Sequence, residues 1–232
     1  RRFPPSEEFR AAANWKDPAV YDRARDDFEG FWGEMAEAID WYQPWEQILD
    51  WDPPNARWFV GAKTNICHNC VDRHLAERAD QTAILFEGDY PDVSRHITYR
   101  ELHAEVCKLA NALESLGITD GDRVMLYMPM VPEAAYAMLA CTRIGAIHSI
   151  VFGGFSAEAC RDRINDSQAS ILICADGYYR NGKTIPSKNG ADIAMAANPS
   201  IQKSIVVKRA NIEVPMQEGR DLWWDDLMAE ED

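Results

Sequence analysis

From about residue 82 onward, apolar segments of strand length alternate with segments of helical periodicity. Continuous apolar runs, typical of strands buried on both faces, occupy residues 124–128, 146–152, 170–175 and 204–208. Apolar side chains at three- and four-residue steps predict helices over residues 99–116, 132–144, 156–164 and 191–197. The alternation predicts an α/β fold, with a mainly parallel sheet flanked by helices.

Local signals support these elements. Thr98 and Glu101 have the spacing of a capping box at the start of the first helix, and Gly117 follows its last apolar residue. Two short strands, at residues 83–86 and 96–99, are predicted to pair through a turn.

The first part of the chain has a different pattern. Six of the eight tryptophans lie within its first sixty residues: Trp15, Trp32, Trp41, Trp45, Trp51 and Trp58. Asp17-Pro18 predicts a helix start, and aromatic and apolar side chains follow at helical spacing as far as Ile39. We therefore predict an aromatic-rich helical extension over residues 1–80 that wraps a body formed by residues 81–232.

Ligand sites of parallel sheets lie at the carboxyl ends of the strands, so the loops after Met128, Val151 and Cys174 are the places to search. The first loop contains no acid, base or nucleophile. The second places Gly153-Gly154 between Phe152 and a helix cap at Ser156. Such a turn lets a ligand approach the backbone beside an aromatic face, but a Gly-Gly turn often serves the backbone alone.

The third loop, residues 176–189, concentrates cations. Arg180 and Lys183 flank Asn181-Gly182, so both could reach one phosphate, and Lys188 follows. A solvated hairpin with scattered charge accounts for the composition equally well.

Charge and composition narrow the function classes. A formal net charge of −14 argues against a nucleic-acid partner, so an anionic ligand has to be held by a few local cations. No apolar run is long enough to cross a bilayer and no secretory signal opens the sequence, so we expect no membrane partner and a cytoplasmic protein. Both the dinucleotide fingerprint and the phosphate-binding P-loop motif are missing from the sequence.

Little in the sequence supports a metal site or a catalytic nucleophile. Cys67-His68-Asn69-Cys70, followed by His74, resembles half of a zinc site, but no second pair stands at a matching interval. Coincidental spacing explains it better, so we expect no metal site. The histidines and cysteines form no nucleophile–base set, and no catalytic residue is assigned.

Several stretches closely resemble the N-terminal part of AMP-forming acetyl-CoA synthetases, within the adenylate-forming acyl-CoA synthetase superfamily. The matching segments run in order along the chain: residues 57–61, 69–75, 127–134, 145–156 and 219–224. The resemblance implies formation of acetyl-adenylate from acetate and Mg-ATP, then displacement of AMP by the thiol of CoA. It places Phe152, Gly153 and Gly154 against the adenine of CoA, and Arg180, Asn181, Gly182 and Lys183 at its phosphorylated end. Lys183 stands where relatives commonly have Arg.

The resemblance also predicts what this sequence does not contain. The superfamily's Gly-rich phosphate loop, the acetate pocket and the small C-terminal domain all follow the matched region. We therefore expect an incomplete part of a larger N-terminal domain, partnered by the rest of its own chain, inactive alone and without a tightly bound cofactor. A non-catalytic CoA- or nucleotide-binding module, a subunit-interaction module and a propionyl-CoA synthetase fragment stay open as alternatives.

Overall fold

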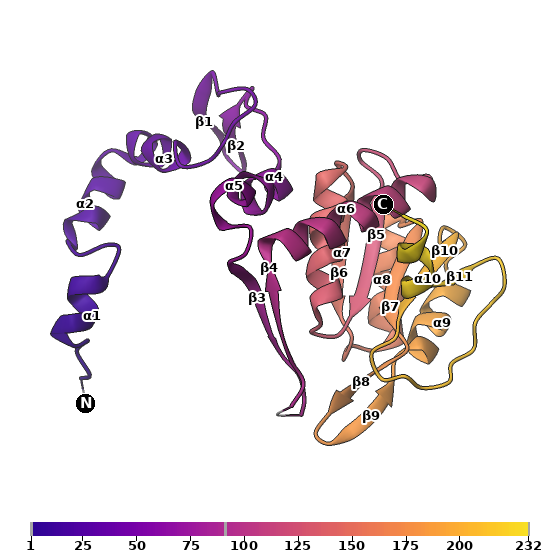
Figure 1. Ribbon diagram of the computed structural model, residues 1–232. Coiled ribbons are helices and arrows are strands. Elements are labelled where there is room, and N and C mark those ends of the chain that lie inside the picture. The colour runs from indigo at the N-terminus through magenta and orange to yellow at the C-terminus, as the bar shows by residue number, and fades with distance from the viewer. Residues whose placement is uncertain (1, 91, 232) are drawn as a thin grey trace. The chain divides into compact units, whose positions relative to one another are not determined.

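The computed structural model describes residues 2–90 and 92–231 (Figure 1). These residues form two compact units, which divide between residues 64 and 65. The predicted extension ends at residue 80, whereas the compact units divide after Thr64. The segment after residue 64 packs within the second unit, where the Asn65 side-chain amide donates to the Thr142 carbonyl at 2.8 Å. Asp72 likewise pairs with Arg143 at 2.7 Å.

The first unit consists of short helices and one β-hairpin. Its elements are α1 (Glu7–Ala12), α2 (Ala19–Asp26), α3 (Phe28–Ala36), β1 (Gln47–Asp52) and β2 (Asn55–Val60), with β1 and β2 antiparallel. The prediction of one helix running to Ile39 is wrong. Asp27 leaves helical geometry at φ −132° and ψ 73°, and its carboxylate accepts a hydrogen bond from the Gly30 amide at 3.1 Å. A capping side chain inside the apolar pattern thus starts a new helix.

Aromatic side chains of the first unit pack against one another. Phe28 lies 5.6 Å from Trp58 between ring centroids, and Trp41 lies 5.4 Å from Trp45. Several of these rings keep much of their surface exposed within the structure, among them Trp32 and Trp58. The clustering agrees with packing as the role of the aromatic positions, since rings at these distances attract one another.

The second unit contains a five-stranded parallel sheet, which confirms the predicted fold class. Its strands are β5 (Arg123–Met128), β6 (Ile147–Phe152), β7 (Ile171–Ala175), β10 (Lys203–Val207) and β11 (Asp221–Trp223). They lie in the order β11-β10-β7-β5-β6, and each neighbouring pair is parallel.

Helices cover both faces of this sheet (Figure 1). They are α6 (Tyr99–Ser115), α7 (Pro132–Arg143) and α10 (Trp224–Ala229) on one face, with α8 (Ala157–Ser167) and α9 (Lys188–Ala196) on the other. Alternate β5 side chains enter different cores: Leu126 packs with α6 and α7, whereas Met125 packs with α8 and α9. Burial on both faces explains the continuous apolar runs of β5, β7 and β10. The run of β6, the edge strand, is not buried in this way, because Ile147 and Ile150 are 54% and 50% exposed.

The capping box predicted for α6 is confirmed. The Thr98 hydroxyl accepts a hydrogen bond from the Glu101 amide, and the Glu101 carboxylate accepts one from the Thr98 amide at 2.8 Å. Gly117 follows the helix with φ +88°, a conformation that favours glycine.

Smaller elements complete the second unit. They are α4 (Ile66–Cys70), the 3₁₀ helix η1 (Asp72–His74), α5 (Leu75–Arg78) and the antiparallel pairs β3 (Thr82–Glu87) with β4 (Ser94–Thr98) and β8 (Gly177–Arg180) with β9 (Lys183–Pro186). The β3–β4 hairpin was expected from the sequence. The β8–β9 hairpin replaces the loop that we predicted over residues 176–189.

Candidate functional site

The strand order creates a crevice at the carboxyl end of the sheet. β5 lies between β6, the next strand along the chain, and β7, which follows β6. The chain therefore leaves β5 toward α7 on one face, and leaves β7 toward α9 on the other. Loops that diverge in this way open a space at the strand ends, where ligands of such sheets bind.

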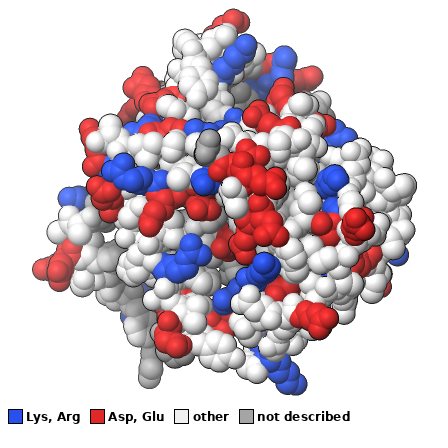
Figure 2. Space-filling model, turned by 45° about the vertical axis from the view of Figure 1, so that its right-hand side comes forward, with Lys and Arg blue, Asp and Glu red and all other residues white. Residues whose placement is uncertain are grey.

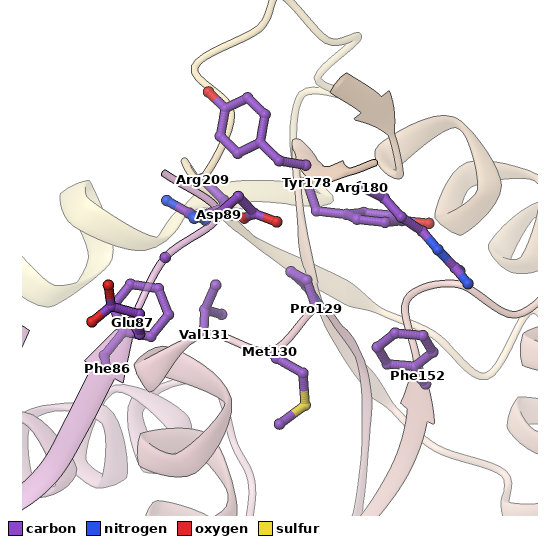
Figure 3. A pocket seen from close by; sticks show the side chains of 12 residues that line it. Phe86, Glu87, Asp89, Pro129, Met130, Val131, Phe152, Tyr178, Arg180 and Arg209 are labelled. Carbon is purple, nitrogen blue, oxygen red and sulfur yellow. Dashed lines mark hydrogen bonds and ion pairs between the residues drawn. The ribbon is translucent and has the colours of Figure 1, made fainter. Parts of the chain in front are cut away.

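A cavity of about 350 Å³ lies at this position (Figure 3). All three loops singled out in the sequence contribute to its wall, together with the β3–β4 hairpin and the loop after β10. The lining residues are Phe86, Glu87, Gly88, Asp89, Pro129, Met130, Val131, Phe152, Tyr178, Tyr179, Arg180 and Arg209. Among the seven candidate site residues, Phe152 and Arg180 line the cavity directly.

The glycine turn after β6 is held close to the end of β5. The Gly153 amide donates to the Met128 carbonyl at 2.9 Å, and a Cβ on Gly153 would lie 3.2 Å from backbone atoms of Met128 and Pro129. The Tyr127 hydroxyl donates to the Phe155 carbonyl at 2.6 Å. Burial raises the pKa of Tyr127 to about 12, so this hydroxyl stays a donor at physiological pH. Two hydrogen bonds thus hold the turn in place, one from the Gly153 amide and one from the Tyr127 hydroxyl.

Gly154 makes room for a side chain from another loop. A Cβ at Gly154 would lie 2.8 Å from a ring carbon of Phe152 and 3.0 Å from Nη1 of Arg180. Figure 3 shows the Arg180 guanidinium extending toward the Phe152 ring, whose residue is 42% exposed. The fold therefore brings together the accessible ring of Phe152, the exposed backbone of Gly154 and the guanidinium of Arg180, whereas Gly153 is buried against the end of β5.

The remaining candidate residues form the tip of the β8–β9 hairpin. Arg180 pairs with Lys183 across a turn in which Asn181 and Gly182 have φ values of +51° and +71°. Positive φ at both central residues is the reason that Asn-Gly is favoured in two-residue hairpin turns. Asn181, Gly182 and Lys183 are exposed and lie beyond the cavity lining. Both hairpin cations are accessible, and they stand at neighbouring strand ends.

A buried carboxylate fixes the base of this hairpin. Asp176 is fully buried and accepts hydrogen bonds from four backbone amides: Gly177 at 2.7 Å, Arg209 at 2.8 Å, Ala210 at 2.9 Å and Ile212 at 3.0 Å. Four donors compensate a carboxylate that burial alone would destabilise. The end of β7 is thereby joined to the loop after β10.

Arg209 also lines the cavity, and it was not among the residues predicted for the site. Its guanidinium pairs with Asp89 at 3.1 Å and lies over the rings of Phe86 and Tyr179, at 5.5 and 5.3 Å from their centroids. The signal was present, because Arg209 follows the apolar run at residues 204–208, and the rule about carboxyl strand ends covers that strand as well.

Lys188, the third cation of the predicted loop, is not available to a ligand. Its ammonium is fully buried and bonds to Asp192 at 2.7 Å and Asp221 at 2.8 Å. Arg220 bonds to the same two carboxylates, at 2.5 and 2.6 Å. Lys188, Arg220, Asp192 and Asp221 form one network, here called the α9–β11 ion network, in which each charge is compensated.

The Cys67-His68-Asn69-Cys70 motif lies in α4. The Cys67 thiol is buried and receives a hydrogen bond from Arg143 at 3.3 Å, whereas Cys70 is exposed. Burial raises the pKa of Cys67, which disfavours the thiolate that a metal site needs. Among the described residues, no group of three or more His, Cys, Asp or Glu side chains is placed to hold a metal ion.

Acidic side chains gather near the middle of one face of the molecule (Figure 2). On the face drawn in Figure 2, basic side chains are scattered among acidic ones rather than joined into one patch. Within the described part of the chain, no helix combines the length and apolar character needed to span a membrane.

Comparison with known proteins adds to this geometry. The family model of AMP-binding enzymes matches residues 71–230, and the model described as the acetyl-coenzyme A synthetase N-terminus matches residues 18–70. The acetyl-coenzyme A synthetase of Rubrobacter xylanophilus is 52% identical over 99% of this chain, and that of Syntrophus aciditrophicus is 50% identical over 98%. The chain spans about a third of these relatives, 36% of each.

A solved structure shows the same arrangement. The acetoacetyl-CoA synthetase from Streptomyces lividans matches with a TM-score of 0.85 and 28% identity, over 96% of this chain and 34% of that one. The resemblance noted in the sequence is thus confirmed by sequence and fold. Because one family model covers most of the chain, this protein belongs to the family of AMP-binding enzymes, and the acetyl-coenzyme A synthetase N-terminus precedes that region.

Proposed function

We propose that this chain is the N-terminal part of an AMP-forming acetyl-CoA synthetase. In that reaction a carboxylate oxygen of acetate attacks the α-phosphate of Mg-ATP, giving acetyl-adenylate and pyrophosphate. The thiol of CoA then attacks the acetyl carbon, and AMP leaves with the former anhydride oxygen. The identity of about 50% to acetyl-coenzyme A synthetases along nearly the whole chain carries this proposal.

Within that enzyme, the part of the site present here is assigned to the nucleotide end of CoA. The adenine would stack on Phe152, beside the exposed backbone of Gly154, while the buried Gly153 would hold the turn close to the end of β5. The Arg180 guanidinium stands beside this platform and can hold a phosphate through two hydrogen bonds. Lys183 adds a point charge at the neighbouring strand end.

The electrostatics favour such local recognition. The chain carries a net charge of −14, so its overall charge repels a polyanion such as CoA. Arg180 and Lys183 are exposed at one hairpin tip, beside the exposed ring of Phe152, so positive charge is available to an anion at this position. Their contribution is binding and orientation, which bring the thiol to the adenylate in a fixed geometry.

ATP, Mg²⁺ and acetate are expected to bind through other parts of the enzyme. The resemblance assigns the phosphate loop and the acetate pocket to segments with no counterpart in this sequence. We expect the 232-residue chain alone to release neither AMP nor pyrophosphate when given acetate, ATP and CoA; turnover by the purified chain contradicts this expectation. The cytoplasmic location stays a prediction.

Separate assays of the two half-reactions distinguish a role in CoA binding from a role in adenylate formation. In the full-length enzyme, Phe152→Ala and Arg180→Ala are expected to raise the KM for CoA about tenfold or more, because base stacking and a charged hydrogen bond are each worth about 1–3 kcal/mol. Acetate-dependent exchange between ATP and pyrophosphate does not use CoA, so its rate is expected to stay unchanged.

A matched control is available on α8. Arg161 is a partly exposed arginine that pairs with the adjacent Asp162 at 2.8 Å and does not line the cavity, so Arg161→Ala removes the same group elsewhere. It is expected to leave both assays unchanged. If Phe152→Ala and Arg180→Ala both leave the KM for CoA at the wild-type value, the CoA assignment is wrong; absence of acetyl-CoA formation by the full-length protein refutes the wider proposal.

A further inference from the structure

Arg209 joins three segments that are distant in the sequence. Its backbone amide donates to the buried Asp176 at 2.8 Å, which fixes the residue at the end of β10. Its guanidinium pairs with Asp89, beyond the end of β3, at 3.1 Å. The same guanidinium lies over the Tyr179 ring of β8, 5.3 Å from the centroid. One side chain thus contacts both hairpins from a fixed base.

The contacts around Arg209 form a stack of planar groups. Phe86 of β3 lies on the guanidinium, at 5.5 Å, and Tyr90 packs edge-on against Tyr179 at 5.5 Å. The Arg209 side chain is only 17% exposed, so these interactions are weakly screened by solvent. Lysine could keep the charge in this position but could not provide the planar face.

This stack is next to Arg180, the residue that we propose contacts a phosphate of CoA. Tyr179 is the residue before Arg180, and β8 consists of Gly177–Arg180. A second contact holds β8 at its first residue, where the Asp176 carboxylate accepts a hydrogen bond from the Gly177 amide. A two-stranded hairpin is marginally stable by itself, so contacts along its length decide where its tip points. The Tyr179 ring connects the middle of β8 to Tyr90 of the segment between β3 and β4, and to Arg209 after β10.

We infer that Arg209 is a positioning residue, which holds the β8–β9 hairpin against the β3–β4 hairpin so that Arg180 stands beside Gly154 and Phe152. The inference rests on the proposed CoA site, since its effect on activity passes through Arg180. Arg209 itself is directed into the stack and toward Asp89 (Figure 3). It acts on the ligand through the hairpin.

The test uses Arg209→Met and Arg209→Lys in the full-length enzyme. Loss of a partly buried cation–π contact and an ion pair is expected to raise the KM for CoA about five- to tenfold in Arg209→Met. Arg209→Lys keeps a charge for Asp89 without the stacked plane and should show a smaller increase. The rate of ATP–pyrophosphate exchange should not change in either variant.

Hydrogen exchange provides a readout that does not depend on CoA. In Arg209→Met the amides of residues 177–186 should exchange about tenfold faster, while amides of β5 and β7 keep wild-type rates. Arg23 offers a matched control in the other unit, because it too has an ion pair, with Glu34 at 2.8 Å, and an aromatic face, Phe31 at 5.1 Å. Arg23→Met should leave both readouts unchanged.

The outcomes are separable. Faster exchange in the hairpin together with a raised KM for CoA supports the inference. A raised KM with wild-type exchange overturns it and makes Arg209 a direct ligand contact, whereas faster exchange throughout the sheet overturns it in favour of a general structural role. If the exchange changes as expected but neither Arg209→Met nor Arg180→Ala alters the KM for CoA, the hairpin contact stands and the CoA assignment fails.

Discussion

The hairpin cations and the α9–β11 ion network make an instructive comparison, because Lys183 and Lys188 are only a few residues apart in the chain. Arg180 and Lys183 are exposed at a hairpin tip, and Arg180 faces an open cavity. Lys188 is fully buried between two carboxylates that also bind Arg220. Cations of one loop region thus have opposite roles: the exposed ones are available to a ligand, whereas the buried one is committed to the fold.

The largest expected effect is on stability. Lys188→Met leaves buried carboxylate charge with less compensation, and we expect it to lower the free energy of unfolding by about 3 kcal/mol. Urea denaturation measures this loss. Lys183→Met is the matched control on the exposed side and should change the free energy by less than about 0.5 kcal/mol. Equal losses in the two variants contradict the comparison.

Acid should weaken the buried network. Burial alone would raise the pKa of Asp221, but hydrogen bonds from Arg220, the Gln217 amide and Lys188 outweigh it and lower this pKa below its ordinary value of 3.8. A carboxylate with a lowered pKa in the folded state contributes stability that is present above its unfolded pKa and is lost as the pH falls through the folded one. We therefore expect this contribution to be constant from pH 7 to about 5 and to decline below about pH 4.

Thermal unfolding of wild type and Asp221→Asn across this range measures the effect. The variant is expected to be less stable than wild type at pH 7, with the difference shrinking below about pH 4 because the wild-type carboxylate becomes protonated. A difference that stays the same down to pH 3 excludes the ionised form of Asp221 as the stabilising one.

Salt should act on the exposed cations instead. Screening is effective at about 10 Å in 0.1 M salt, so the KM for CoA of the full-length enzyme should rise about two- to threefold between 0.05 and 0.3 M NaCl. The rise should be smaller in Arg180→Ala, which has already lost one charge contact. A salt response that is the same in both proteins removes Arg180 from the electrostatic interaction.

The smallest effect concerns the shape of the second cation. Lys183→Arg keeps the charge and adds a planar fork that can bind a phosphate through two hydrogen bonds. We expect it to lower the KM for CoA about twofold, because an exposed charged contact changes little in water. Steady-state kinetics with CoA as the varied substrate measure this change, and an increased KM indicates that lysine suits this hairpin better.

The sheet and its helices were predictable because their signals are local. Thr98 and Glu101 satisfy each other's amides within one turn, and an apolar run such as Val124–Met128 needs burial on both faces. The break at Asp27 was missed because the apolar spacing continues across it, while a single capping carboxylate decides the backbone. The β8–β9 hairpin was expected only as an alternative to a loop, because its strands are four residues long and Asn181-Gly182 is its clearest local signal.

The candidate site was predictable only in outline. Carboxyl strand ends of a parallel sheet share one edge, so the loops after β5, β6 and β7 were expected to meet, and they line one cavity. Which side chains meet there could not be read from spacing. The approach of Arg180 to Gly154 depends on the position of a hairpin that Arg209 contacts from another strand end.

The amino-acid sequence by itself determined the alternation of strands and helices, the family resemblance and the presence of a few cations in an acidic chain, because these follow from local pattern and composition. The tertiary structure decided which cations remain available. Lys188 and Arg180 both follow β7, yet one is surrounded by Asp192 and Asp221 and the other faces an open cavity. Charge compensation depends on neighbours from distant segments, and only the folded chain brings those neighbours together.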